Sequence, residues 1–225
     1  MFWENTTKLP KIESCQDILI VYGVFKPDDL ELMSRILTPE ELNFAGRLKN
    51  QDQKNTWISC HITHRLMVGE FLQLNPQNIV FKKNRFGKPY LQDSNLSFNI
   101  SHTYNSFLLC YYQGGKIGVD LENLSGNEDI PSLIDYAFSD AETEYCRNGD
   151  ELSVRFLELW TLKEAFLKYS GIGLTDFLKS VNVYGSDQND LISNELNYST
   201  FICPKNETCS VVYPGHPSIS CFWLC

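Results

Sequence analysis

The hydrophobic pattern of the first half of the chain predicts a mixture of strands and helices. A continuous apolar run at residues 18–25 is typical of a buried strand. Helical spacing follows at 28–37, and Thr38-Pro39-Glu40-Glu41 predicts the start of another helix, because it combines a capping box with proline in the first turn. A longer helical pattern covers residues 52–72 and is broken by Asn75-Pro76. Strands are predicted at residues 79–82, 96–101, 106–112 and 116–122.

The second half repeats this mixture. Ser139-Asp140-Ala141-Glu142 is a capping signal for a short helix, and the strongest helical pattern of the chain runs from residue 151 to 169 and closes at Gly171. Strands are predicted at residues 180–184, at 198–203, and at 209–213 or 219–224. We therefore expect an α+β fold with two halves, residues 1–114 and 115–225, that join at a Gln-Gly-Gly turn.

Composition indicates a folded, acidic protein. Hydrophobic residues make up 43% of the 225 positions, which is enough for a sizeable core. The formal net charge of −9 argues against a general nucleic-acid-binding protein, which needs a basic face. No apolar run approaches the roughly 20 residues of a membrane span, and residues 1–13 lack the pattern of a signal peptide. We expect a cytoplasmic protein that has neither a nucleic acid nor a membrane as its partner.

The eight cysteines are predicted to be reduced and mostly buried. None forms a C-x-x-C pair, and a chain without an export signal belongs to a reducing compartment. Cys209, Cys221 and Cys225 are near enough in sequence for a cluster, but buried strand positions are the preferred interpretation. The others are Cys15, Cys60, Cys110, Cys146 and Cys203.

Charge is distributed unevenly along the chain. Residues 43–92 carry a balance of +6, whereas residues 117–160 carry a balance of −9. A basic stretch beside a carboxylate-rich stretch suits a phosphate site next to a metal site. From charge alone, two oppositely charged solvated faces are the preferred interpretation, because charge runs usually lie at the surface.

Two carboxylates alternate with apolar residues in the predicted strand at 116–122. Strand alternation places Asp120 and Glu122 on one face, with Val119 and Leu121 in the core. Carboxylates on one face repel each other unless a cation lies between them, and Mg²⁺ commonly takes one or two carboxylates together with a substrate phosphate. The alternative is an edge strand whose carboxylates simply face solvent.

The predicted helix at 151–169 carries a stripe of functional side chains. Trp160, Glu164 and Lys168 follow one another at intervals of four residues and therefore lie along one face. Glu164 could add a third carboxylate to a metal and Lys168 could meet a phosphate. The alternative is an ordinary intrahelical ion pair at the surface.

A third group of polar residues lies towards the end of the first half. Gly87-Lys88-Pro89 predicts a turn that carries a lysine, and Ser101-His102 ends a predicted strand. Lys88 and His102 could both bind phosphate, or they could be a plain surface lysine and a hydrogen-bonded histidine. The chain has no G-x-S-x-G sequence, so a hydrolase nucleophile elbow is not indicated.

Taken in order, the motifs G-K-P, F-N-I-S-H, I-G-V-D-x-E and W-T-x-K-E-A-x-x-K resemble those of the Sfp-type 4′-phosphopantetheinyl transferases. The resemblance implies a pseudo-dimer of two similar α+β halves, with the active site at their interface. It also implies an enzyme that uses Mg²⁺ to transfer 4′-phosphopantetheine from coenzyme A to a serine of an apo carrier protein, releasing 3′,5′-ADP.

The resemblance also assigns roles to individual residues. It implies metal ligation by Asp120, Glu122 and Glu164, with Glu164 also the base for the incoming serine. Lys168 would neutralise the pyrophosphate, and Lys163 is a weaker candidate for a phosphate contact. Ser101 and His102 would contact the 3′-phosphate, and Gly87, Lys88 and Pro89 would line the adenine side.

One part of the family pattern is missing. A gapless count places Thr56 where the family has an arginine that holds the 3′-phosphate, and the segment after the capping box reads Glu41-Leu42-Asn43-Phe44 instead of being basic. Arg47 and Lys54 are the nearest basic residues that could hold the 3′-phosphate instead.

The implied partners are coenzyme A and acidic carrier proteins, and we expect a monomer. A net charge of −9 means that docking must use a local patch, for which apolar residues around Phe138, Tyr145 and Phe166 are candidates. Two alternatives remain open: a metal-dependent phosphohydrolase that uses the same carboxylates, and a non-catalytic module that binds the carrier or the coenzyme.

Overall fold

The computed structural model describes residues 2–12, 17–26, 28–124, 129–148, 150–172, 178–184 and 196–224. The chain divides into two compact units. Unit 1 comprises Met1–Lys82, Pro89–Gly114 and Pro217–Cys225, and unit 2 comprises Lys83–Lys88 and Gly115–His216. The sequence pattern divided the chain into residues 1–114 and 115–225. In the structure, residues 83–88 group with unit 2 and residues 217–225 group with unit 1.

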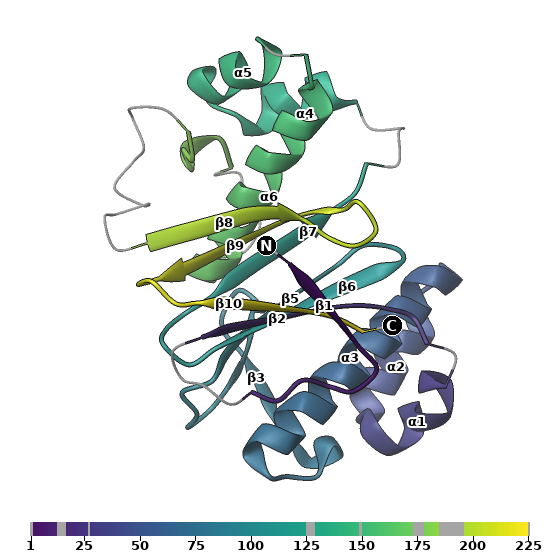
Figure 1. Ribbon diagram of the computed structural model, residues 1–225. Coiled ribbons are helices and arrows are strands. Elements are labelled where there is room, and N and C mark those ends of the chain that lie inside the picture. The colour runs from purple at the N-terminus through teal and green to yellow at the C-terminus, as the bar shows by residue number, and fades with distance from the viewer. Residues whose placement is uncertain are drawn as a thin grey trace. The chain divides into compact units, whose positions relative to one another are not determined.

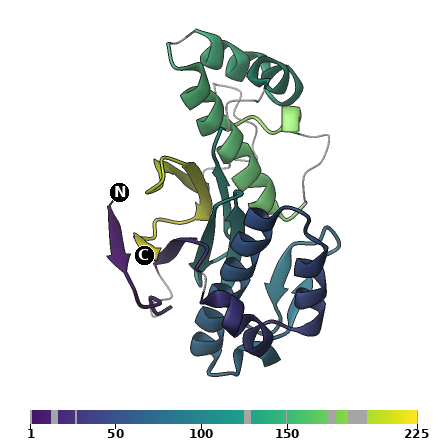
Figure 2. The ribbon, with the colours of Figure 1, turned by 90° about the vertical axis from the view of Figure 1, so that its right-hand side faces the viewer.

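Unit 1 is built on a five-stranded sheet in the order β1-β10-β2-β6-β5. Its strands are β1 (Trp3–Thr6), β2 (Ile18–Val24), β5 (Ser97–His102), β6 (Ser106–Tyr112) and β10 (Ile219–Leu224). β10 is parallel to both β1 and β2, whereas β2 and β5 pair antiparallel with β6. A segment from the far end of the sequence therefore completes the sheet, and Figure 2 shows the purple β1 beside the yellow strand.

The helices of unit 1 lie between β2 and β5 in the sequence. They are α1 (Asp29–Ile36), α2 (Pro39–Arg47), α3 (Gln51–Leu72) and the short η1 (Pro76–Asn78), and the strands β3 (Phe81–Lys83) and β4 (Pro89–Leu91) form a separate pair. The predicted capping box is confirmed, since Thr38 Oγ1 accepts from Glu41 N and Glu41 Oε2 accepts from Thr38 N. Helix α3 packs Cys60, Met67 and Val68 against the apolar face of the sheet.

Unit 2 has a three-stranded antiparallel sheet in the order β7-β9-β8. Its elements are β7 (Gly118–Glu122), α4 (Ile130–Ala137), α5 (Asp140–Arg147), α6 (Leu152–Ser170), η2 (Leu178–Ser180), β8 (Leu196–Ile202) and β9 (Thr208–Pro214). The long α6 packs on β7 and β9 (Figure 1). Both units thus combine an antiparallel strand pair with a long helix laid on it, as the expected α+β class requires.

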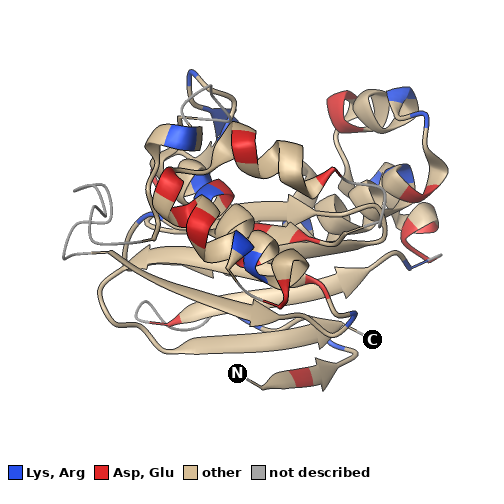
Figure 3. Ribbon diagram, turned by 90° about the horizontal axis from the view of Figure 1, so that it is seen from above, with Lys and Arg blue, Asp and Glu red and all other residues tan. Residues whose placement is uncertain are grey.

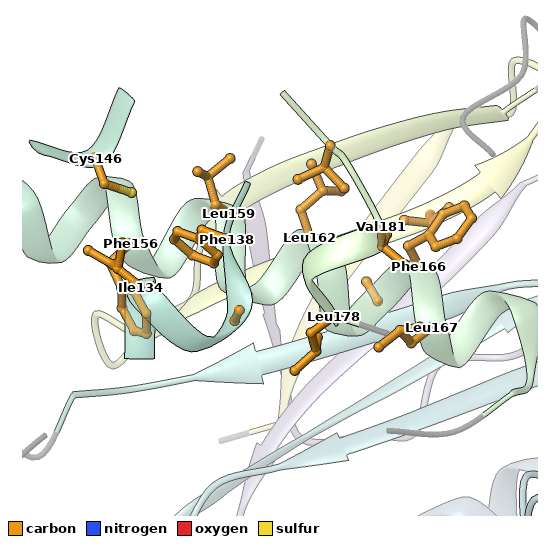
Figure 4. Close-up of a cluster of buried hydrophobic side chains, with 14 residues drawn as sticks. Ile134, Phe138, Cys146, Phe156, Leu159, Leu162, Phe166, Leu167, Leu178 and Val181 are labelled. Carbon is orange, nitrogen blue, oxygen red and sulfur yellow. The ribbon is translucent and has the colours of Figure 1, made fainter. Parts of the chain in front are cut away.

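The core of unit 2 lies between α6 and its neighbouring helices. Phe138 and Phe156 lie close together, and Leu178 and Val181 approach the far end of α6 (Figure 4). The strand predicted at residues 180–184 is wrong, because η2 occupies Leu178–Ser180 and no strand follows in the described part of that segment. Val181 and Val183 alternate as a strand would, but they bury their side chains in this helical core instead.

Both segments offered as alternatives for a last strand are strands, β9 and β10. The structure also adds α4, β1 and β4, which the hydrophobic pattern did not predict.

The cysteines follow the expected pattern. Six cysteines of the described ranges are free and buried, namely Cys60, Cys110, Cys146, Cys203, Cys209 and Cys221, whereas Cys15 and Cys225 lie outside those ranges. Most charged residues lie on helices and loops (Figure 3). Among the described residues, no helix is both long and apolar enough to cross a membrane.

Candidate active site

Helix α6 lies very close to the backbone of β7 at Gly118. A Cβ atom on Gly118 would lie 2.0 Å from the carbonyl oxygen of Ala165 and 2.4 Å from the amide nitrogen of Tyr169. No side chain fits in such a space, so only glycine allows the last turns of α6 to pack directly on this strand. This packing brings the stripe of α6 that carries Glu164 and Lys168 to the strand that carries Asp120 and Glu122.

An ion pair links the two elements. Lys168 Nζ donates to Asp120 Oδ1 at 2.6 Å. Asp120 is buried, with 3% of its surface exposed, whereas the Lys168 side chain keeps 29% of its surface exposed. The lysine that the sequence placed beside Glu164 therefore also reaches a strand carboxylate 48 positions away.

Glu164 and Glu122 have strongly perturbed acidities. Burial and, after it, the neighbouring carboxylate of Asp120 raise the pKa of Glu164 to about 7, although Lys168 opposes the shift. Burial, Asp120 and Glu164 likewise raise the pKa of Glu122 to about 7, against Lys168 and a hydrogen bond from Trp160. Both carboxyl groups are thus poised to exchange a proton near neutral pH.

The donor set fits a hard divalent cation by type and by charge. Asp120, Glu122 and Glu164 offer carboxylate oxygens, which Mg²⁺ prefers. A cation of charge +2 would relieve the repulsion that helps to raise the pKa values of Glu122 and Glu164. As the side chains stand, no three His, Cys, Asp or Glu residues in the described segments form a ready-made metal-binding group. Metal ligation by these residues therefore stays a prediction.

Hydroxyl groups form a row across the sheet next to Asp120. The strand register pairs Asp120 with Ser210 and Ser210 with Thr200. Ser210 Oγ lies 2.7 Å from Thr161 Oγ1 of α6 and 2.8 Å from Thr200 Oγ1. The sequence did not reveal this network, because each hydroxyl reads as an ordinary strand or helix residue until the register is known.

Lys163 lies away from these carboxylates, in the interior of unit 2. Its ammonium group donates to the carbonyl oxygens of Ala137, Leu178 and Val181 at 2.7–2.9 Å, and it pairs with Glu142 Oε2 at 2.7 Å. Both side chains of this ion pair are 0% exposed. The predicted contact between Lys163 and a phosphate is therefore wrong for this structure, because the ammonium is sealed from solvent and fully engaged.

The turn predicted at residues 87–89 lies slightly earlier, where Gly87 N donates to the carbonyl oxygen of Asn84 at 3.0 Å. Gly87 has φ of +90°, which favours glycine. Lys88 Nζ donates to the carbonyl oxygens of Ile117, at 2.9 Å, and Lys168, at 2.5 Å. Burial lowers the pKa of Lys88 to about 8, with smaller effects from Lys116 and Lys168. Pro89 opens β4 in unit 1.

The remaining candidates lie in unit 1. Ser101 is buried and His102 is exposed at the end of β5. Arg47 is exposed in the last turn of α2, and Lys54 is half-buried near the start of α3. Thr56 is buried and its Oγ1 donates to the carbonyl oxygen of Tyr104 at 2.8 Å, so this position serves the packing of unit 1.

The apolar docking patch suggested by the sequence is wrong. Phe138 and Phe166 are 1% and 3% exposed, because both belong to the core of unit 2. Tyr145 is half-buried and its hydroxyl donates to Glu158.

Comparison with known proteins agrees with the motifs. Residues 116–211 match the family model described as the 4′-phosphopantetheinyl transferase superfamily, and residues 26–110 match the one described as 4′-phosphopantetheinyl transferase, N-terminal. A 4′-phosphopantetheinyl transferase of Bacillus subtilis is 33% identical over 176 residues, which is 72% of this chain and 75% of the relative.

Two further relatives show the same likeness. The transferase Sfp of Bacillus subtilis strain 168 is 27% identical over 173 residues, 72% of this chain and 75% of its own length. The transferase HetI of Nostoc sp. strain PCC 7120 is 32% identical over 151 residues, and the match covers 64% of each chain. This chain therefore belongs to the 4′-phosphopantetheinyl transferase superfamily.

Proposed function

We propose that the protein transfers the 4′-phosphopantetheine group of coenzyme A to a serine of an apo carrier protein and releases 3′,5′-ADP. The observation that carries the proposal is the group of Asp120, Glu122, Glu164 and Lys168 where α6 packs on β7, in a chain of this family. Three carboxylates and an ammonium at one place are what a phosphoryl-transfer site needs.

Asp120, Glu122 and Glu164 would hold a magnesium ion. Bound there, the ion would supply positive charge to the phosphate oxygens of coenzyme A. The residues fit the ion because burial and the neighbouring carboxylates make the negative charges of Glu122 and Glu164 unfavourable without a cation.

Glu164 is the proposed base. Its carboxylate can accept the proton of the serine hydroxyl, directly or through a water molecule. The serine oxygen then forms a bond to the β-phosphorus while the bond from that phosphorus to the bridging oxygen breaks, and 3′,5′-ADP leaves. Lys168, which remains partly exposed, would neutralise charge on the phosphates as that bond breaks.

We further propose that residues of both units hold coenzyme A, as the family resemblance implies. Ser101 and His102 would contact the 3′-phosphate, and Gly87 and Pro89 would line the adenine side. Arg47 and Lys54 are the proposed substitutes for the basic residue that Thr56 replaces. Arg47 and His102 have the exposure that a ligand contact requires.

The proposed partners are coenzyme A and apo carrier proteins or carrier domains, acted on by a monomer in the cytoplasm. Six buried cysteines without a disulfide in the described ranges support a reducing compartment. The chain spans 64% of HetI and 61% of a putative Synechocystis transferase, so these assignments are proposals for the activity of the protein as a whole.

Intact-mass spectrometry tests the proposal. Purified protein, coenzyme A, Mg²⁺ and several apo carrier proteins are incubated, and the carrier is expected to gain one phosphopantetheine. Glu164→Gln and Asp120→Asn should abolish the gain while circular dichroism stays unchanged. Glu144→Gln, at an exposed position of α5 in the same unit, is the matched control and should react as the unchanged protein does.

Other outcomes would overturn the proposal. Release of 3′,5′-ADP without modification of any carrier would indicate a phosphohydrolase. Binding of coenzyme A with neither product would indicate a non-catalytic binding module.

A further inference from the structure

The segment that contains Gly87 packs on the C-terminal end of α6 within unit 2. Asn84 organises this segment, because its side-chain oxygen accepts hydrogen bonds from the backbone N–H groups of Phe86 and Lys88, each at 2.9 Å. The same amide group donates from Nδ2 to the carbonyl oxygen of Gly171 at 2.8 Å. One side chain thus both folds the turn and attaches it to the end of the helix.

Lys88 makes the second attachment. Its ammonium donates to the carbonyl oxygen of Lys168, in the last turn of α6, and to that of Ile117, which directly precedes β7. The last carbonyl groups of a helix have no partner inside the helix, and a cation there is favoured by the helix dipole. The turn therefore caps α6 from a segment some 80 residues earlier in the sequence.

The two carbonyl groups that Lys88 joins flank the candidate active site. Ile117 lies three residues before Asp120, and Lys168 is the residue whose own ammonium pairs with Asp120. Gly118 lets the two backbones lie close together, but glycine has no side chain that could link them by a hydrogen bond. Lys88 supplies a polar link between the same two backbones.

We propose that Lys88 is a positioning residue that fixes the spacing between α6 and β7, assisted by Asn84. The proposal rests on the proposed transfer reaction, and it replaces the expectation that Lys88 serves coenzyme A directly. Lys88 acts through Lys168 and Asp120, because its ammonium is committed to backbone oxygens.

Steady-state kinetics of Lys88→Met tests the proposal, because methionine keeps an apolar stem and loses both hydrogen bonds. Displacement of catalytic groups by about 1 Å can cost on the order of 100-fold in rate. We expect kcat to fall by about that factor, while KM for coenzyme A and its Kd from calorimetry stay within about twofold. Lys83→Met, at an exposed lysine of the same segment, is the matched control and should change neither parameter.

Asn84→Asp is a second test variant, and unlike Lys88→Met it removes no positive charge. Aspartate still accepts from Phe86 and Lys88 but cannot donate to Gly171. We expect a smaller loss of kcat with KM unchanged, which a lost charge contact to phosphate cannot explain. Hydrogen exchange should become faster at the amides of the last turn of α6 in both variants, including that of Gly171, which donates to Leu167.

A rise in KM and Kd for coenzyme A with unchanged kcat would overturn the inference, and so would unchanged exchange in the last turn of α6. If the unchanged protein modifies no carrier, the proposed reaction fails, and the exchange measurement still decides whether Lys88 and Asn84 fix this end of the helix. If Lys88→Met does not fold, Asn84→Asp gives the same two readouts.

Discussion

Replacing Lys163 by methionine is expected to destabilise unit 2 strongly. Methionine keeps an apolar stem of similar length but removes the ammonium that three backbone carbonyl groups and Glu142 share. Because both side chains of the ion pair are 0% exposed, water cannot take the place of the lost donor.

The size of the stability loss depends on the buried groups that lose their partner. Removing one partner of a buried ion pair typically costs about 3–5 kcal/mol, since the other charge remains buried. Glu142 keeps hydrogen bonds from the backbone N–H groups of Ser139 and Val183, which moderates the cost on its side. The carbonyl groups of Ala137, Leu178 and Val181 all lose the ammonium as hydrogen-bond donor, which increases the loss of stability. We expect the free energy of unfolding to fall by about 4 kcal/mol.

Urea unfolding measures this loss, with hydrogen exchange of α6 to assign it to unit 2. Lys179→Met is the matched control, because Lys179 is an exposed lysine of the same unit whose ammonium only approaches Asp135 O at 3.4 Å. It should change stability by less than about 0.5 kcal/mol. The double variant Lys163→Met, Glu142→Leu should recover a large part of the loss, since no unpaired charge then remains buried.

One result would refute this reasoning. If Lys163→Met unfolds within about 1 kcal/mol of the unchanged protein and instead raises KM for coenzyme A, then Lys163 contacts a phosphate. That was the expectation from the sequence.

Three further predictions concern other parts of the chain. Gly118→Ala should abolish transfer and destabilise the fold by about 1–3 kcal/mol through overpacking, whereas Gly46→Ala in an exposed helix with open space should be neutral or slightly stabilising in urea unfolding. Burial lowers the pKa of His61 to about 4 and that of His64 well below its usual value, so the unfolded chain binds more protons below about pH 6.5. The two histidines should therefore favour unfolding from pH 6.5 towards 4, whereas Glu122 and Glu164, whose pKa values are raised to about 7, favour the folded state over an overlapping range. In a Glu122→Gln, Glu164→Gln background, unfolding midpoints should fall from pH 6.5 towards 4, and a flat profile there would contradict this. If His102 contacts the 3′-phosphate, His102→Ala should lower kcat/KM roughly tenfold for coenzyme A and leave dephospho-coenzyme A unaffected; equal losses with the two donors would reject the contact.

Sequence reasoning reached the candidate carboxylates because their placement depends on local periodicity. Strand alternation put Asp120 and Glu122 on one face, and helical spacing put Glu164 and Lys168 on one stripe. Sequence reasoning could not place Lys163, which directly precedes Glu164 on the same helix but points to a different side of it. The partners of Lys163 are backbone groups from α4, η2 and the segment after η2, and their approach to α6 is set by tertiary packing.

The same limit explains the errors in the fold. Val181 and Val183 alternate with polar residues as in a strand, but their side chains are buried in the core around α6. This burial outweighed their intrinsic preference for a strand. The sequence pattern did not predict that residues 83–88 group with unit 2, since this depends on the hydrogen bonds of Asn84 and Lys88 with distant carbonyl groups.

The insertion of β10 between β1 and β2 has a consequence for how the protein is made. During synthesis β2 can pair with β6 as soon as residue 112 has emerged, but the place beside β2 that β10 takes stays open until residues 219–224 arrive. Until then β1 has no neighbouring strand, and one edge of β2 is exposed to other unfinished chains. A ribosome-bound nascent chain is thus expected to hold unit 1 incomplete, and removal of residues 217–225 should yield an aggregation-prone product.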